Sequence, residues 1–240
     1  RLDFNLYDYQ KDAVEKIITT DNTLLAFDVG AGKTYIMIAA AMKMRQEGIS
    51  RKNLFVVPNN IVGQWEKIFS DLYPKAKTLA IDPKSFKPEM RAKVLQQMKA
   101  GDYDGIIIAY SCLEMIPLSE DYLRNDYYNF ATRIRSAVDS QFSDYRSKSH
   151  YDKPVENLKK YIWKLTQQLI TDAPSSSKEI TFDDLEINTI FLDEAHNYKN
   201  VPIKTALKNL TGINTAGSKK CFDMMKKIRC VQDFNNGRGA

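Results

Sequence analysis

Short apolar runs alternate along the chain with segments in which apolar residues recur every three or four positions. The short runs predict buried strands at residues 23–27, 53–57, 77–81, 105–109 and 188–193. The periodic segments predict amphipathic helices at residues 9–20, 33–47, 60–72 and 85–99. Strands that alternate with helices form a mostly parallel sheet with helices on both faces, so the pattern predicts an open α/β fold. Ligands of such folds bind beyond the carboxyl ends of the strands.

The alternation stops between residues 118 and 181, in a long polar stretch that is rich in Tyr. Two helical patterns lie within it, near residues 121–142 and 154–170. We interpret the stretch as a helical hairpin inserted into the α/β fold. Its ten basic and nine acidic residues leave the surface nearly neutral, which does not favour a nucleic-acid groove there.

Composition excludes several classes of protein. With 240 residues, 43% of them hydrophobic and 27% charged, the chain can bury a sizeable core and is neither disordered nor fibrous. Its apolar runs are far shorter than the roughly 20 residues of a membrane-spanning helix, so no membrane partner is expected. The N-terminus lacks an initiating Met and an apolar signal core, and we expect a cytoplasmic piece of a longer polypeptide. Three cysteines without Cys-x-x-Cys spacing and two histidines predict neither a disulfide framework nor a zinc site.

The net charge of +5 is concentrated near the C-terminus. Residues 199–240 hold nine basic and two acidic residues, a local charge of +7. Residues 218–234 also have an amphipathic helical pattern, which leaves two interpretations of the lysines there. They form either the solvent-facing side of the helix or a surface that contacts DNA phosphates. The lysines concerned are Lys219, Lys220, Lys226 and Lys227.

A Gly-containing loop at residues 28–34 follows the first predicted strand and precedes a predicted helix. This arrangement is typical of a phosphate-binding loop, in which backbone amides surround a polyphosphate at the positive end of a helix. Lys33 would reach the β- and γ-phosphates, and the Thr34 hydroxyl would ligate Mg²⁺. The amides that would face the phosphates belong to Gly30, Ala31 and Gly32.

Two adjacent carboxylates, Asp193 and Glu194, end the last predicted strand. Read alone, such a pair is usually the N-cap of a following helix. Together with an upstream phosphate loop it favours nucleotide chemistry. Asp193 would hold Mg²⁺ largely through water, and Glu194 would orient and deprotonate the water that attacks the γ-phosphate.

The order of these blocks resembles the first motor lobe of superfamily 2 helicases. Asp-Glu-Ala-His at residues 193–196, the DEAH box, follows a strand and lies downstream of Gly-Ala-Gly-Lys-Thr at residues 30–34. The Lys-Asn end of residues 193–200 and the Gln-Trp end of residues 55–65 resemble Swi/Snf-type DNA translocases. Residues 106–113 resemble the strand and turn that touch the DNA backbone in that family. The resemblance implies a RecA-like P-loop NTPase lobe.

The resemblance also implies roles for other side chains. Residues 6–10 resemble the adenine-sensing block, in which Gln10 reads the base edge and Tyr7 stacks on the base. His196 would couple the nucleotide and DNA sites. The implied cofactors are ATP and Mg²⁺, and the implied partners are duplex DNA and a second RecA-like lobe that supplies arginine fingers. Trp65 lies in a helical pattern, and we interpret it as a packing residue.

Residues 1–240 are interpreted as one ATP-binding lobe with the insertion at residues 118–181. Residues 210–212 look like the family's Thr-Gly-Thr-Pro block but lack the proline, so we expect the chain to stop before the last strand. Within the family, the chain most resembles helicase domains of phage and mobile-element proteins, which are often attached to adenine-specific DNA methyltransferases.

The sequence therefore predicts a motor lobe that couples ATP hydrolysis to movement on duplex DNA and that hydrolyses poorly by itself. Two alternatives remain open at this point. One is a nucleotide-sensing module that never cycles, and the other is a docking module in which the Tyr-rich insertion binds a partner of a larger DNA-modifying protein.

Overall fold

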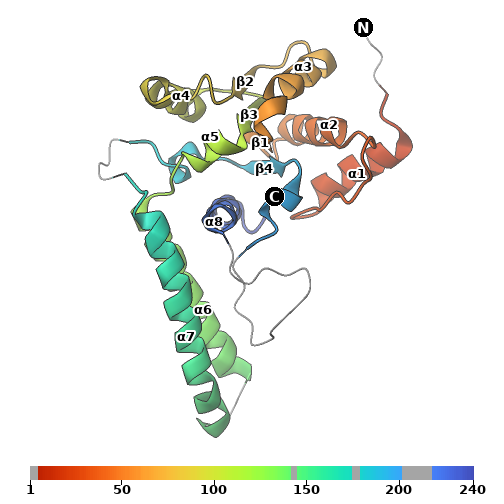
Figure 1. Ribbon diagram of the computed structural model, residues 1–240. Coiled ribbons are helices and arrows are strands. Elements are labelled where there is room, and N and C mark those ends of the chain that lie inside the picture. The colour runs from red at the N-terminus through yellow and green to blue at the C-terminus, as the bar shows by residue number, and fades with distance from the viewer. Residues whose placement is uncertain (1–4, 142–144, 175–178, 202–217) are drawn as a thin grey trace. The chain divides into compact units, whose positions relative to one another are not determined.

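A parallel sheet of four strands forms the centre of the fold, in the order β2-β3-β1-β4 (Figure 1). The computed structural model describes residues 5–141, 145–174, 179–201 and 218–240. Helices surround the sheet, which confirms the predicted α/β fold. The strands are β1 (Asn53–Val57), β2 (Thr78–Ile81), β3 (Gly105–Ala109) and β4 (Thr189–Leu192).

The two inner strands, β1 and β3, are buried along their whole length, as expected for strands covered on both faces. Val57 pairs with Ala109 at the carboxyl ends of these strands, and Val56 pairs with Leu192 of β4. Because all strands run parallel, the residues that follow β1, β3 and β4 lie at one edge of the sheet. Tyr110 and Asp193 are the first residues after β3 and β4.

Most of the predicted helices are present within a few residues of their expected bounds, and two follow the hairpin pattern of residues 118–181. None of the helices in the described part of the chain is long and apolar enough to cross a membrane. The α-helices are α1 (Asp8–Thr19), α2 (Lys33–Gln46), α3 (Val62–Leu72), α4 (Pro88–Ala100), α5 (Tyr110–Glu114), α6 (Glu120–Gln141), α7 (Tyr145–Ile170) and α8 (Lys219–Phe234). The 3₁₀ helices are η1 (Asn59–Ile61), η2 (Asp183–Leu185) and η3 (Ala195–Tyr198).

The prediction of a strand at residues 23–27 is wrong, since these residues have no regular secondary structure. At this side of the sheet, the backbone N–H of Ile190 in β4 donates to the carbonyl of Gly239 at 2.8 Å. The N–H of Thr23 donates to the carbonyl of Ala240 at 3.1 Å. Residues 239–240 therefore lie between the segment 23–27 and β4, and they accept hydrogen bonds from both. The apolar run at residues 23–27 carries no information about this distant partner.

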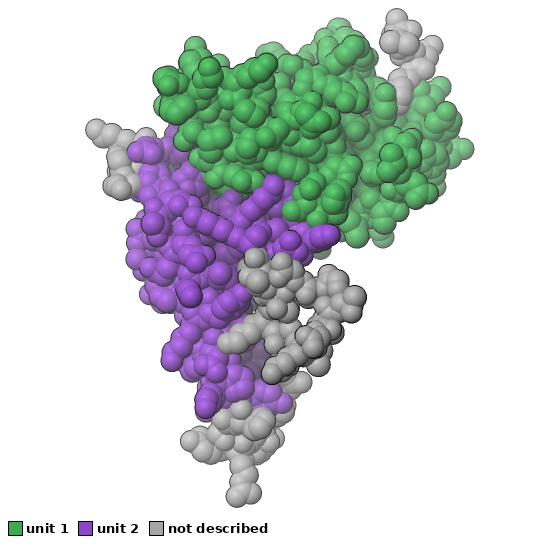
Figure 2. Space-filling model, viewed as in Figure 1, with its two compact units in different colours: residues 1–116, 182–197, 227–240 green, residues 117–181, 198–226 purple. Residues whose placement is uncertain are grey.

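The chain forms two compact units, shown in different colours in Figure 2. Unit 1 contains the sheet, and unit 2 contains α6 and α7, which pack along each other. In unit 2 the rings of Tyr127 and Trp163 lie 4.7 Å apart, and the Arg124 guanidinium lies 5.6 Å from the Trp163 ring. Unit 1 comprises residues 1–116, 182–197 and 227–240, and unit 2 comprises residues 117–181 and 198–226.

Two of the four lysines are buried, so both interpretations, a solvent-facing helix side and a DNA contact, are wrong for them. Within unit 2, the Lys226 ammonium donates to the Asp126 carboxylate, and neither side chain is more than 2% exposed. Within unit 1, the Lys227 ammonium donates to the carbonyl of Leu113 at 2.8 Å and is fully buried. A buried lysine needs such partners because burial of an unpaired charge is costly. Residues 202–217, which include the block at 210–212, lie outside the described residues.

Candidate nucleotide-binding site

The loop before α2 has the backbone conformation of a phosphate cradle. Gly30 and Gly32 have φ angles of +88° and +78°, in the left-handed region that glycine adopts without steric cost. Gly32 is the N-cap of α2, so the free amides of the first helical turn and the positive end of the helix dipole lie at this loop. A Cβ at Gly32 would lie 2.5 Å from Nε2 of Gln10, so a larger residue there would displace the end of the Gln10 side chain.

Lys33 lies folded over this loop. Its ammonium donates to the carbonyls of Phe27 at 3.0 Å and Asp28 at 3.1 Å. These are neutral acceptors, which a phosphate oxygen would outcompete because hydrogen bonds between charged groups are stronger. Thr34 follows in the first turn of α2.

Residues 7–10 are tied to the glycine loop through one carbonyl. The Gln10 side chain is buried, accepts a hydrogen bond from the N–H of Tyr7 at 3.0 Å and donates to the carbonyl of Ala31 at 3.0 Å. The Tyr9 hydroxyl donates to the same Ala31 carbonyl at 3.1 Å. The rings of Tyr7 and Tyr9 are stacked with centroids 5.9 Å apart.

Tyr9 is therefore a site residue that sequence reasoning missed. Its ring also contacts Phe27 edge-on, with centroids 5.9 Å apart, so it connects α1 to the segment that leads into the phosphate loop. The available signal was its position directly before Gln10 in a block already assigned to adenine.

The Asp193–Glu194 turn directly follows β4. The Asp193 N–H continues the ladder to the Val56 carbonyl at 3.0 Å, and the Asp193 carboxylate accepts the N–H of Glu194 at 3.0 Å. Glu194 has a φ of +50°, a left-handed conformation that costs a non-glycine residue about 1–3 kcal/mol. Such strain is common where a side chain must point in a functional direction.

Burial raises the pKa of the Asp193 carboxyl, and the nearby Glu194 charge raises it further. Hydrogen bonds from the Glu194 N–H and the Trp65 indole, and the positive charge of Lys33, act in the opposite direction. Trp65 is buried against Phe55, as the packing interpretation expects, with ring centroids 5.5 Å apart. Its indole N–H also reaches Asp193, a contact that the sequence interpretation missed although Gln-Trp was singled out.

His196 lies beside the second carboxylate. Its Nδ1 is 3.1 Å from Oε2 of Glu194, and both side chains are exposed. The imidazole therefore contacts the carboxylate directly, which is the geometry needed for a residue that responds to the state of Glu194.

Predicted residues from both blocks line one cleft of unit 1, with a volume of about 960 Å³, whereas Gly30, Ala31, Gly32, Thr34, Gln10 and Tyr7 are not among its lining residues. Lys33 comes from the phosphate loop, and Asp193, Glu194 and His196 come from the turn after β4. The cleft also has an apolar part, formed by Leu24, Leu25, Phe27, Ile190 and Phe234 among others.

The oxygen donors fit Mg²⁺ held mainly by water and phosphate. The Thr34 hydroxyl and the Asp193 carboxylate are hard ligands of the kind that Mg²⁺ prefers, and nucleotide sites commonly supply only one or two protein ligands. In the described part of the chain, no three His, Cys, Asp or Glu side chains cluster as a dedicated metal cage.

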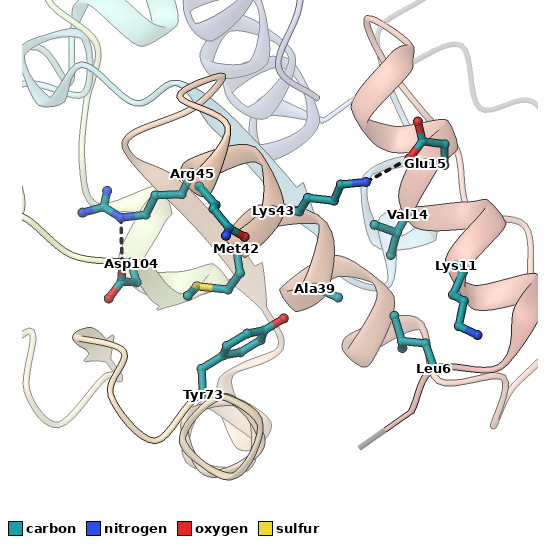
Figure 3. Close-up of a pocket in the computed structure, with 11 residues that line it drawn as sticks. Leu6, Lys11, Val14, Glu15, Ala39, Met42, Lys43, Arg45, Tyr73 and Asp104 are labelled. Atoms are coloured by element: carbon teal, nitrogen blue, oxygen red, sulfur yellow. Dashed lines mark hydrogen bonds and ion pairs between the residues drawn. The ribbon is translucent and has the colours of Figure 1, made fainter. Parts of the chain in front are cut away.

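A second pocket, of about 830 Å³, lies between α1 and α2 and includes Tyr73 (Figure 3). Its cationic side chains face carboxylates. Lys43 is 3.0 Å from Glu15, and Nε of Arg45 is 2.7 Å from Asp104. Because these charges are already neutralised locally, the pocket is a poorer phosphate site than the cleft at Lys33.

Comparison with protein families gives a match to the family described as "Probable helicase domain", over residues 17–239. The chain belongs to this helicase domain family. The match includes the glycine loop at residues 28–34, the Asp193–Glu194 turn and all of residues 118–181.

This helicase domain is also similar to individual proteins of known sequence or structure. "Defense against restriction protein B" of Escherichia phage P1 is 23% identical over 97% of the chain, which spans 12% of that protein's length. The solved structure of the Sulfolobus solfataricus SWI2/SNF2 ATPase core in complex with dsDNA is 25% identical, with a TM-score of 0.38, over 46% of this chain and 22% of that one.

The buried charge of Asp193 leads to a prediction about the stability of the helicase domain. Because its folded-state pKa lies above the ordinary value of 3.8, the folded state holds this proton more tightly than the unfolded state. The protonated Asp193 carboxyl therefore favours the folded state at low pH. This contribution to the free energy of unfolding is lost as the pH rises from 3.8 through the folded-state pKa. Asp193→Asn is expected to raise the melting temperature at neutral pH and to flatten this pH dependence.

Thermal unfolding between pH 4 and pH 8, in the absence of nucleotide, checks the prediction. Asp71→Asn is a suitable control, because Asp71 is a surface carboxylate paired with Lys67 on α3. A lower melting temperature for Asp193→Asn than for the control would contradict this view of the Asp193 charge.

Proposed function

We propose that this helicase domain is the ATP-binding motor lobe of a DNA-dependent ATPase. The observation that carries the proposal is the single cleft in which Lys33, from a glycine loop at a helix N-terminus, lies with Asp193 and Glu194, which follow a buried parallel strand. A polyphosphate, its metal ion and an attacking water need these groups together.

Each candidate site residue has a proposed role. Lys33 and the loop amides bind the β- and γ-phosphates, while Thr34 and Asp193 hold Mg²⁺. Glu194 orients the attacking water and takes its proton. His196, which contacts Glu194, couples the nucleotide site to the DNA site. The amides are those of Gly30, Ala31 and Gly32.

Adenine recognition is assigned to α1 and the residues before it. Gln10 has a hydrogen bond from one end of its amide to the phosphate loop, so a base that engages this amide would also affect the loop. Tyr7 is 70% exposed and stacked on Tyr9, and it offers a free ring face to a purine.

The finer assignment is to DEAH-box, Swi/Snf-type translocation along duplex DNA. It is supported by residues 193–200 and 55–65, which resemble the corresponding blocks of that group. A second RecA-like lobe, and an attached DNA-modifying domain such as a methyltransferase, are proposed parts of the whole protein.

The proposal is tested with the full polypeptide that carries this domain. ATP hydrolysis is measured with no DNA, with blunt duplex and with single strands, and triplex displacement is used to detect movement along duplex. We expect duplex to stimulate hydrolysis and the triplex to be displaced without separation of the duplex strands. Nucleotide binding with no DNA-stimulated turnover would instead indicate a non-cycling sensor.

A further inference from the structure

Tyr110 connects the end of β3 to the Asp193–Glu194 turn. It is the first residue of α5, its side chain is buried, and its hydroxyl donates to the backbone carbonyl of Asp193. The same hydroxyl lies 3.4 Å from the carbonyl of Glu194. Both carbonyls flank the residue whose carboxylate is proposed to activate water.

The carbonyls that Tyr110 reaches determine how the turn is oriented. Glu194 is held at a φ of +50°, which a non-glycine residue adopts only when its surroundings enforce it. Asn197 contributes to this, because its backbone N–H and side-chain amide donate to the Glu194 carbonyl at 3.0 and 3.1 Å. Asn197 lies on the same stretch of chain, whereas Tyr110 ties the two carbonyls of the turn to the end of β3.

The hydroxyl is suited to a permanent donor role. A tyrosine hydroxyl is an ordinary hydrogen-bond donor, and this one is buried where it reaches the Asp193 carbonyl. Removal of the hydroxyl would leave the Asp193 carbonyl without this buried donor.

We propose that Tyr110 is a positioning residue for ATP hydrolysis, which holds the Asp193–Glu194 turn in the orientation that aims the Glu194 carboxylate into the cleft. This inference rests on the proposed function. Tyr110 does not touch nucleotide itself in this scheme, so its hydroxyl affects the rate of the chemical step and not the affinity for ATP.

Tyr110→Phe in the full polypeptide tests the inference, because it removes the hydroxyl and keeps the ring. We expect kcat for DNA-stimulated hydrolysis to fall by about 10- to 100-fold, the scale of loss from a misplacement of about 1 Å. The KM for ATP and the Kd for Mg-ATP should stay within about twofold. Tyr73→Phe is the matched control, since Tyr73 is a half-buried tyrosine at the pocket between α1 and α2, away from the turn, and we expect wild-type kinetics for it.

A double variant separates positioning from general structural damage. If Tyr110 acts through Glu194, adding Tyr110→Phe to Glu194→Gln should lower the single-turnover rate no further, because the group being positioned is already disabled. An unchanged kcat in Tyr110→Phe, or a full additional loss in the double variant, would overturn the inference. If the wild-type protein itself does not hydrolyse ATP, the proposed function fails, and that outcome is recognised before any variant is compared.

Discussion

Glu194→Gln is expected to lower kcat for ATP hydrolysis by about 10²- to 10⁴-fold, the usual contribution of a general base. Gln keeps the size of the side chain and can still contact His196, but it cannot take a proton from the attacking water. Because the phosphates are held by Lys33 and the loop before α2, the affinity for Mg-ATP should change little. Steady-state hydrolysis with duplex DNA and calorimetric titration of Mg-ATP measure the two effects separately.

Glu186→Gln is the matched control for this variant. Glu186 follows the 3₁₀ helix η2 of unit 1 and has a φ of +53°, so it shares the left-handed backbone of Glu194 but lies outside the cleft. We expect wild-type turnover for it. Turnover of Glu194→Gln within a fewfold of wild type would show that another group activates the water.

Asp126→Ala is expected to lower the free energy of unfolding of unit 2 by about 3–5 kcal/mol, the cost of removing one partner of a buried ion pair. The Lys226 ammonium lies within a side chain that is only 2% exposed, and loss of the Asp126 carboxylate removes its anionic partner. The ammonium also lies 5.0 Å from the Phe222 ring, which cannot replace a carboxylate. Urea unfolding followed by fluorescence and circular dichroism measures the loss.

Asp172→Ala serves as the comparison, because Asp172 pairs with Lys219 in the same unit while both side chains are about half exposed. An exposed pair of this kind contributes about 0–1 kcal/mol. Equal, small losses for the two variants would mean that Lys226 is accessible to solvent. In that case the hypothesis that Lys226 contacts DNA phosphates would return.

Periodicity and residue type were sufficient to predict most of the fold. β1 and β3 match their predicted bounds. A short, continuous apolar run is typical of a strand of a parallel sheet that is buried on both faces. The segment 23–27 is also a short apolar run, yet it is not a strand. Its hydrogen-bonding neighbour at Thr23 is Ala240, more than 200 positions away, and no local pattern encodes that pairing.

The candidate site shows the same division between local and long-range information. The glycine loop and the Asp-Glu pair were recognised because each is a contiguous block with its chemistry in its own side chains. Tyr110 and Trp65 were not assigned to the site, because their contacts with Asp193 join elements far apart in the sequence. The sequence around Lys226 also did not predict its burial, since its partner Asp126 lies 100 positions away in the insertion.

The central claim is that Lys33 and its loop bind the phosphates of ATP, and calorimetric titration of Mg-ATP tests it most directly. Lys33→Ala should weaken binding by about 10- to 100-fold, as expected for the loss of a charged hydrogen bond. Lys43→Ala, on the opposite end of the same helix and paired with Glu15, should bind as the wild type does. Equal affinities of wild type and Lys33→Ala would contradict the assignment of the nucleotide site to this cleft.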